Sequence, residues 1–192
     1  MQEIQEVLIR VEQEHSKEEK TIVEAAYKLM KDAHKGQKRA DGTDFYKHPL
    51  AATKLLLRQG HTDPEVLAAT LLHDVVEDTH ITLKEIEERF GKKIAFLVDA
   101  VTDPGRQAHE KTIEDKYERS KKMQEKIRLA AEQDERVYLV KLADRVHNLS
   151  TLTALSQEAQ KRIKKESLEF HRVIAHEQGL EEFKLLIEKH TR

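Results

Sequence analysis

The sequence predicts an all-α protein, a single bundle of about ten helices. Three observations support this fold class. Apolar residues recur at the helical period along most of the chain, while the alternation typical of strands is scarce. Only 6 glycines and 3 prolines occur in 192 residues, so few positions break the helices. No internal repeat, low-complexity segment or shift in composition marks a linker, so we expect one domain over residues 1–192.

Start and stop signals place the helices in order. The first segment, MQEIQEVLIRVEQEH, combines acids and apolar residues at helical spacing. Further along, Asp63 is the expected N-cap of a helix that has Pro64 at its first position. Thr82 and Glu85 carry the capping-box pattern, and Gly91 ends that helix. The predicted helices lie near residues 2–14, 17–34, 48–60, 64–78, 82–89, 91–102, 109–132, 134–154, 156–175 and 178–190, with a loop at 102–107.

The composition argues against several classes of protein. With 38% hydrophobic and 36% charged residues, the chain is globular with a heavily charged exterior. A net charge of −2 argues against a dedicated nucleic-acid binder. The absence of cysteine leaves no thiolate metal site and fits a reducing compartment. No segment approaches the roughly 20 apolar residues of a membrane span. We therefore expect a cytoplasmic protein without membrane or nucleic-acid partners, either a monomer or a homodimer.

A charged cluster follows the most apolar helix. The stretch ATLLHDVVEDTH contains His73, Asp74, Glu77 and Asp78 where a buried helix would carry apolar residues. On a helix that begins at Pro64, His73 and Glu77 share one face, and Asp74 and Asp78 form the neighbouring stripe. Charged groups at such positions cost stability unless a partner or a metal ion satisfies them.

Two further candidate ligands lie elsewhere in the chain. His48, in FYKHPL, precedes a proline that places it at the entrance of a helix. Asp144 is a lone acid in the apolar segment VYLVKLADRVHNLSTL, and Asn148 and Thr151 share its helix face. Each has a structural interpretation as well: His48 as a capping or packing residue, and Asp144 in a salt bridge to Arg145 or Lys141.

Taken together, these residues favour a metal site. They offer two imidazoles and two carboxylates at distant points of an otherwise apolar core. That mixture suits Mn2+, Fe2+ or Zn2+. The four predicted ligands are His48, His73, Asp74 and Asp144.

The same residues fall in four blocks that resemble a known family. The spacing of the four ligands resembles the HD metal-dependent phosphohydrolase superfamily. More narrowly, AHKGQKRADGTDFYKHPLAAT, ATLLHDVVEDTHIT, RFGKKIAFLVDAVTD and VYLVKLADRVHNLSTL resemble, in order, the (p)ppGpp hydrolase domain of the RelA/SpoT family. The resemblance runs from about residue 20 to 175 and implies an HD-type helical bundle. With 192 residues the chain resembles the stand-alone small alarmone hydrolases, such as the metazoan SpoT homologue.

The resemblance implies roles for the matching residues. The metal ligands of the family are matched by His48, His73, Asp74 and Asp144, and the family's usual ion is Mn2+. Glu77 and Asp78 match the pair that orients or deprotonates the attacking water. Arg39 matches a residue that lies against the base, and Asn148 and Thr151 match positions that face the substrate. The implied reaction removes the 3′-pyrophosphate from ppGpp or pppGpp and yields GDP or GTP.

Several positions depart from the family pattern. Ser150 stands where many long members carry arginine, which removes a guanidinium that contacts phosphate or base. Asp44 and Phe45 replace a common Pro-Tyr pair, and Asp41 adds an acid near the expected base pocket. These differences leave the base open, so the adenosine alarmones (p)ppApp and the 2′-phosphate of NADPH stay as alternative substrates.

Two other functions remain as alternatives. One is an HD-fold phosphohydrolase that acts on another nucleotide, such as NADPH or a nucleoside 5′-phosphate. The other is a non-catalytic nucleotide sensor or assembly module with a degenerate site. Glu77, Asp78 and Arg39 favour the alarmone hydrolase, because a generic phosphatase of this fold needs only the four ligands. The complete ligand set argues against the sensor.

Two predictions concern surrounding residues. The segment 103–128 begins with many charges, and we expect a loop that leads into a solvated helix, with a lid over an anionic substrate as the functional alternative. We expect His34, His80 and His147 to be structural. His147 lies about 100° from Asn148 around the helix axis and so leaves the face of the site.

Overall fold

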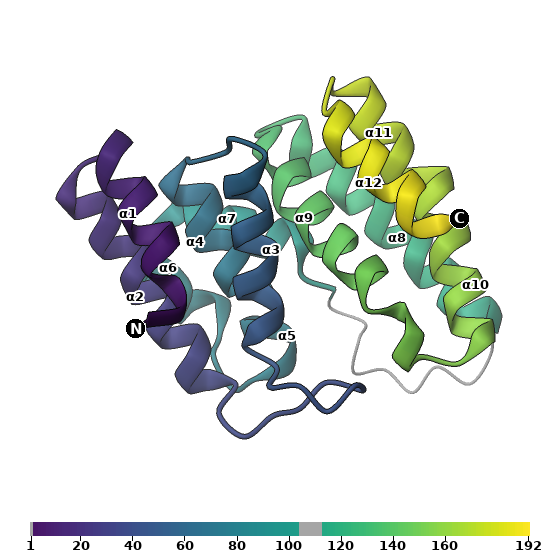
Figure 1. The fold of residues 1–192 in the computed structure, drawn as a ribbon, viewed down its shortest axis with the longest axis horizontal. Helices are drawn as coiled ribbons and strands as arrows, with labels where there is room; N and C mark the ends of the chain where they lie inside the picture. Colours follow the sequence, from purple (N-terminus) through teal and green to yellow (C-terminus); the bar gives the residue numbers. More distant parts are fainter. Residues whose placement is uncertain (1, 104–112) are drawn as a thin grey trace.

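The structure is a computed structural model that describes residues 2–103 and 113–192, and helices dominate both ranges (Figure 1). The helices are α1 (Gln5–Glu14), α2 (Lys17–Ala33), α3 (Lys47–Arg58), α4 (Pro64–Leu72), α5 (Val75–Asp78), α6 (Leu83–Phe90), α7 (Lys92–Val101), α8 (Ile113–Ala131), α9 (Arg136–Ser150), α10 (Gln157–Glu166), α11 (Arg172–Glu177) and α12 (Glu181–Thr191). Short 3-10 turns span Gln2–Ile4 and Leu152–Ala154, and a π-helical turn spans Ser167–His171. The described residues form no strand, so the predicted all-α class is confirmed.

The predicted helix starts are present as expected. The Asp63 carboxylate accepts the Glu65 amide at 2.8 Å at the start of α4. Thr82 and Glu85 form a reciprocal capping box at the start of α6. Gly91 separates α6 from α7 with a φ of 85°, a left-handed conformation that glycine adopts without strain. Local signals in the sequence therefore define these boundaries.

The predicted single helix over residues 64–78 is wrong in one respect. α4 ends at Leu72, and a turn at His73 and Asp74 separates it from the short α5. The Thr70 carbonyl accepts the ring N–H of His73 at 2.7 Å, and this bond competes with the regular helical bond from Asp74. The turn places two candidate ligands at the buried end of α4.

Part of the predicted loop and lid falls outside the described residues. Residues 104–112 belong to it, so most of the loop at 102–107 and the start of the helix at 109–132 are not described. Within 113–192, α8 begins at Ile113. Apart from Asp103, the segment 103–128 is therefore described only in its helical part, and its role as a lid stays a prediction.

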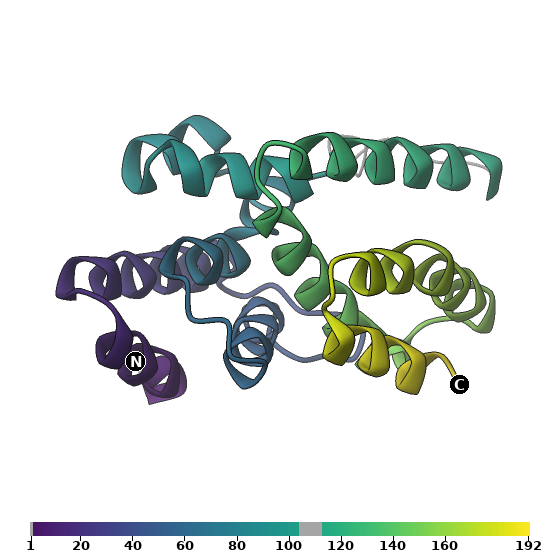
Figure 2. The ribbon, with the colours of Figure 1, turned by 90° about the horizontal axis from the view of Figure 1, so that it is seen from above.

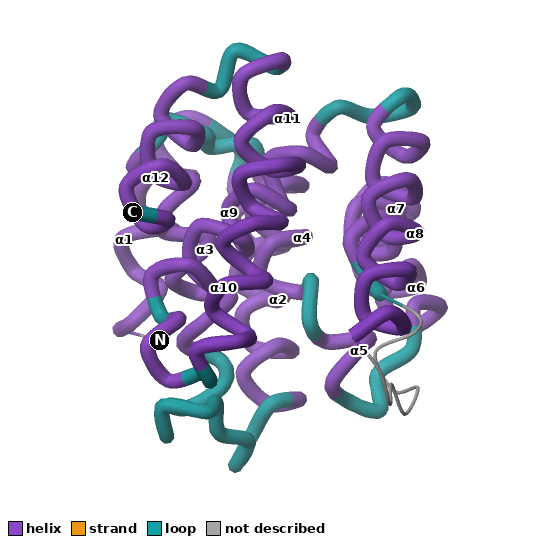
Figure 3. Tube along the Cα trace, turned by 90° about the vertical axis from the view of Figure 1, so that its right-hand side faces the viewer, coloured by secondary structure: helices purple, strands orange, loops and turns teal. Residues whose placement is uncertain are grey.

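α4 forms the centre of the fold. It packs against α2, α3, α7 and α9, and each of its residues except Glu65 is buried. Figures 2 and 3 show α6, α7 and α8 in one layer and the other long helices on the opposite side. The N- and C-termini lie at opposite ends of the molecule (Figure 1). No helix in the described ranges has the length and apolar character required to cross a membrane.

An arginine anchors α9 to α4 at their N-terminal ends. Arg136 Nη1 donates to the carboxylates of Asp63 and Glu65 at 2.8 Å each. Its Nη2 donates to Asp134 at 2.7 Å. Because one guanidinium joins three carboxylates, the relative position of the two helices is set at this end. α4 and α9 lead to the candidate site.

Candidate metal centre

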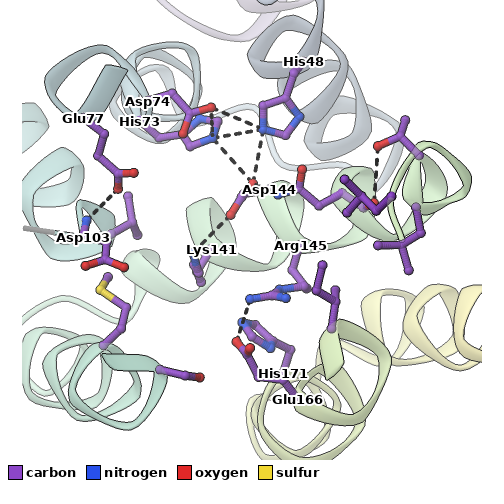
Figure 4. A pocket seen from close by; sticks show the side chains of 18 of the residues that line it. His48, His73, Asp74, Glu77, Asp103, Lys141, Asp144, Arg145, Glu166 and His171 are labelled. Atoms are coloured by element: carbon purple, nitrogen blue, oxygen red, sulfur yellow. Dashed lines mark hydrogen bonds and ion pairs between the residues drawn. The ribbon is translucent and has the colours of Figure 1, made fainter. Parts of the chain in front are cut away.

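The four predicted ligands converge from three separate segments (Figure 4). His48 lies in the first turn of α3, where Pro49 is tolerated because the first helical amides have no partner within the helix. His73 and Asp74 form the turn after α4, and Asp144 lies in the middle of α9. All four are at least nine-tenths buried. The sequence spacing predicted this meeting of residues.

The ligand atoms face a common point. His48 Nε2 lies 3.2 Å from His73 Nε2 and 3.2 Å from Asp144 Oδ1. Asp74 Oδ2 lies 3.5 Å from His48 Nε2 and 3.3 Å from His73 Nε2. The ligand atoms of His48, His73 and Asp74 all lie within 4.8 Å of one another, which is close enough for one ion to reach them.

The donor set fits a divalent ion. His73 Nδ1 donates to the Thr70 carbonyl at 2.7 Å, and a carbonyl can only accept. When the ring of His73 is neutral, its lone pair is therefore on Nε2, the atom that faces the cluster. An outer hydrogen bond of this kind orients histidine ligands in metal sites. Two imidazole nitrogens with carboxylate oxygens suit a borderline or hard transition-metal ion.

Burial and charge shift the pKa values of the cluster. Burial alone would lower the pKa of His73, but Asp74 and Asp144 outweigh it and raise that pKa well above its usual value. Burial opposes ionisation of both carboxyls, yet His73 lowers the pKa of Asp74, and Lys141 with the two imidazoles lowers that of Asp144. Burial lowers the pKa of His48. Without metal, a proton on His73 therefore neutralises part of the acidic charge.

A chain of polar contacts leads away from Asp144. Lys141 Nζ lies 3.1 Å from its Oδ2, so the expected salt bridge to Lys141 is present beside the imidazole contacts. Arg145, the other expected partner, pairs with Glu166 instead. Asn148 donates to Asp144 Oδ1, and Arg39 Nη2 donates to Asn148 Oδ1 at 2.9 Å. The predicted substrate residues Arg39 and Asn148 are thus joined to a candidate metal ligand.

His147 is closer to the centre than the sequence indicated. Its Nδ1 lies 2.7 Å from Nδ1 of His48. Burial, followed by the nearby His48 and Arg39, lowers the pKa of His147 to about 4, so its ring is neutral at pH 7. The helical period places His147 off the face of Asn148, but this period cannot indicate that α3 packs against α9 and brings His48 to His147.

The two predicted catalytic acids lie in different surroundings. Glu77 lines the cavity beside the cluster, and its Oε1 accepts the backbone amide of Asp103 at 2.6 Å (Figure 4). Asp78 is not among the described residues that line the cavity, and its carbonyl accepts Gln37 Nε2 at 2.9 Å. The structure brings Glu77 to the site, and the catalytic role of Asp78 stays a prediction.

The cluster opens into a cavity of about 510 Å³, a volume suited to a small ligand. The predicted substrate residues Arg39, Asn148 and Thr151 all line it. Phe45 lines the same end, with the Arg39 guanidinium 5.8 Å from its ring centre. Arg39 therefore stands at a cavity wall that combines an aromatic face with positive charge.

A further part of the cavity lining was not predicted from the sequence. It contains the ion pair of Arg145 and Glu166, with a separation of 2.8 Å, and the buried ring of His171 (Figure 4). Within the described part of the chain, neither ring nitrogen of His171 has a hydrogen-bond partner. Burial, then Arg145 and Lys141, lowers the pKa of His171 well below its usual value. This wall depends on the π-helical turn, which no sequence signal indicated.

The departures from the family pattern lie in different places. Ser150 is exposed, donates to the carbonyl of His147 at 2.7 Å and is not among the described cavity residues. Asp41 lines the cavity, but its carboxylate accepts the amide of Thr43 at 2.9 Å within its own loop. Of the other histidines, His34 is buried against Phe45, as expected for a structural residue.

Comparison with known proteins defines the class. The family model of the HD domain matches residues 26–181, so the chain belongs to the HD-domain family. This agrees with the resemblance that the four sequence blocks indicated.

Individual relatives narrow the family further. The chain is 39% identical over 164 residues to the bifunctional (p)ppGpp synthase/hydrolase SpoT of Escherichia coli K12, covering 85% of this chain and 23% of that protein. It is 40% identical over 186 residues to a guanosine-3′,5′-bis(diphosphate) 3′-pyrophosphohydrolase of Spiroplasma citri, covering 96% of this chain and 24% of that protein. The chain therefore spans about a quarter of the length of these relatives.

A solved structure supports the same relationship. A metazoan ortholog of SpoT, described as hydrolysing ppGpp, superimposes with a TM-score of 0.70 at 28% identity. The match covers 88% of this chain and 93% of that one. The resemblance to SpoT-type proteins is confirmed.

Metal binding is expected to release a proton. The raised pKa of His73 means that its ring is protonated at pH 7 in the metal-free protein, and an ion on Nε2 must displace that proton. Titration calorimetry with Mn2+ in two buffers of different ionisation enthalpy should show about one proton released per ion, with binding tighter by up to about tenfold per pH unit above neutrality. The gain in Mn2+ affinity should end once the pH passes the raised pKa of His73. Binding that is independent of pH between 6.5 and 8 would contradict a protonated His73.

Proposed function

We propose that this chain is a Mn2+-dependent hydrolase of the 3′-pyrophosphate of (p)ppGpp. The observation that carries the proposal is that the four-residue cluster, Glu77 and Arg39 line one cavity. The cluster supplies a site for a divalent ion, Glu77 an acid beside it, and Arg39 a cationic wall for a nucleotide. The names of the relatives from Escherichia coli and Spiroplasma citri support this substrate class.

The metal would be held by His48, His73, Asp74 and Asp144. When bound, a divalent ion supplies Lewis acidity and lowers the pKa of a water molecule. The charges also favour an anionic substrate. Two carboxylates, protonated His73 and Lys141 sum to zero, whereas two carboxylates, a divalent ion, neutral His73 and Lys141 sum to +1. Metal loading therefore makes the site more positive by one charge, which favours an anionic substrate.

Glu77 is the proposed general base. Its hydrogen bond from the Asp103 amide orients the carboxylate at the edge of the cluster. The attacking water gives a proton to Glu77 while its oxygen bonds to the phosphorus attached to the 3′ oxygen. The bond from this phosphorus to the 3′ oxygen breaks, and that oxygen takes up a proton. The products are pyrophosphate and GDP or GTP.

The nucleoside would lie at the Arg39 end of the cavity. The Arg39 guanidinium is 5.8 Å from the ring centre of Phe45 and donates to Asn148. A planar cation of this kind stacks on a base and contacts phosphate. Thr151 lines the same wall, although its hydroxyl bonds to backbone carbonyls of its own helix. We assign Arg39 and Asn148 to direct contact with the nucleotide and Thr151 to the shape of the wall.

A substrate panel tests the function. With Mn2+ present, ppGpp and pppGpp should be converted to GDP and GTP, with pyrophosphate as the second product. The panel includes ppApp, pppApp and NADPH, because Asp41 adds an acid to the cavity near the base. Release of single phosphate from the alarmones would contradict the proposed bond cleavage. Turnover of NADPH alone would replace the alarmone with another nucleotide.

Glu77→Gln should separate catalysis from metal binding. The amide keeps the size and a carbonyl oxygen for the Asp103 amide, but it cannot take up the proton. We expect Mn2+ affinity to be retained and kcat for ppGpp to fall by roughly 10²–10⁴-fold. The exposed Glu88→Gln is the matched control and should leave kcat unchanged. Near-normal kcat in Glu77→Gln would assign the base to another group.

A further inference from the structure

We propose that His147 is a positioning residue for the metal centre. It accepts a hydrogen bond from Nδ1 of His48 and so holds His48 in the tautomer whose Nε2 can bind a metal ion. The two Nδ1 atoms lie 2.7 Å apart, and the ring centres are 4.7 Å apart. The inference rests on the proposed function only in taking His48 as a metal ligand.

A single proton joins the two rings, and it belongs to one of the two Nδ1 atoms. A hydrogen bond between two ring nitrogens needs a proton on one and a lone pair on the other. His48 Nε2 faces His73 and Asp144 at 3.2 Å each, so this nitrogen is the one directed into the cluster. A metal ion binds Nε2 of His48 through the lone pair of that nitrogen. The single proton of the neutral His48 ring is then on Nδ1. His147 must therefore be the acceptor.

The two imidazoles of the centre are held in different ways. His73 donates to the Thr70 carbonyl, which can only accept, so its tautomer has one possible state. His147 can accept or donate, so the tautomer of His48 has two possible states. If His147 donates, the proton of His48 moves to Nε2 and blocks metal binding there. The tautomer of His147, a residue outside the ligand set, thus determines whether His48 can bind the ion.

The position of His147 in the fold supports this role. It follows Asp144 by three residues on α9, and α9 packs directly against α3, which carries His48. The same helix therefore supplies one ligand and the outer partner of another. Outer partners of this kind change metal affinity by about 10–100-fold when they are removed.

Two substitutions distinguish positioning from simple packing. His147→Asn keeps a side-chain oxygen near the place of Nδ1 that can accept the bond, whereas His147→Phe keeps the ring shape without an acceptor. Titration calorimetry with Mn2+ alone should show binding weakened by about 10–100-fold in the Phe variant and close to wild type in the Asn variant. His61→Phe is the matched control, because it removes a half-buried imidazole that contacts Phe183 instead. Its Mn2+ affinity should not change.

A second readout concerns turnover. Excess Mn2+ should restore kcat of His147→Phe toward the wild-type value, because the loss is one of metal affinity. Wild-type affinity in the Phe variant, or equal weakening in both variants, would overturn the proposal. A wild type that hydrolyses no alarmone would remove the proposed function but leave the affinity comparison valid.

A spectroscopic test covers the case in which a variant fails to fold. Histidine-¹⁵N NMR of the wild type loaded with diamagnetic Zn2+ reports the tautomer of each ring directly. The expected pattern is a proton on Nδ1 of His48 and a lone pair on Nδ1 of His147. The opposite arrangement would overturn the proposal.

Discussion

The candidate metal centre depends on one constraint, the burial of two carboxylates beside two imidazoles. An ionised carboxylate removed from water costs several kcal/mol unless positive charge lies close to it. In the metal-free protein, Lys141 and a proton on His73 supply that charge to Asp74 and Asp144. Such a cluster is retained at a stability cost that a purely structural core would avoid. A divalent ion satisfies the same charges and makes the site one charge more positive than the proton that it displaces.

Three helices, α3, α4 and α9, position this cluster. α4 is buried on all sides, and its regular helix ends where the Thr70 carbonyl accepts the ring of His73. α3 and α9 both pack against α4, so their ligands reach the same point. α9 is positioned by Arg136 at its start, and further along it carries Asp144 and the outer partner of His48. The geometry of the centre therefore depends on how α3 and α9 pack against α4 and against each other.

Many features of the fold and of the candidate site were predictable from the sequence, for identifiable physical reasons. Helix starts depend on local chemistry, so the caps at Asp63 and Thr82 were predicted correctly. The candidate ligands stand out because charged groups in apolar segments need a reason to be there. The break at His73 was missed because it depends on a side chain that competes for a backbone carbonyl. The contacts of His147 and the wall that contains His171 depend on how distant helices pack, which periodicity does not report.

The central claim is that His48, His73, Asp74 and Asp144 hold one ion together, and a crystal of the Mn2+-loaded protein tests it most directly. Anomalous diffraction at the manganese edge should give a single strong peak in the cavity. The account predicts that this peak lies within bonding distance of Nε2 of both imidazoles and of one oxygen from each carboxylate. A peak elsewhere, or four side chains that diverge with no peak among them, would contradict the account.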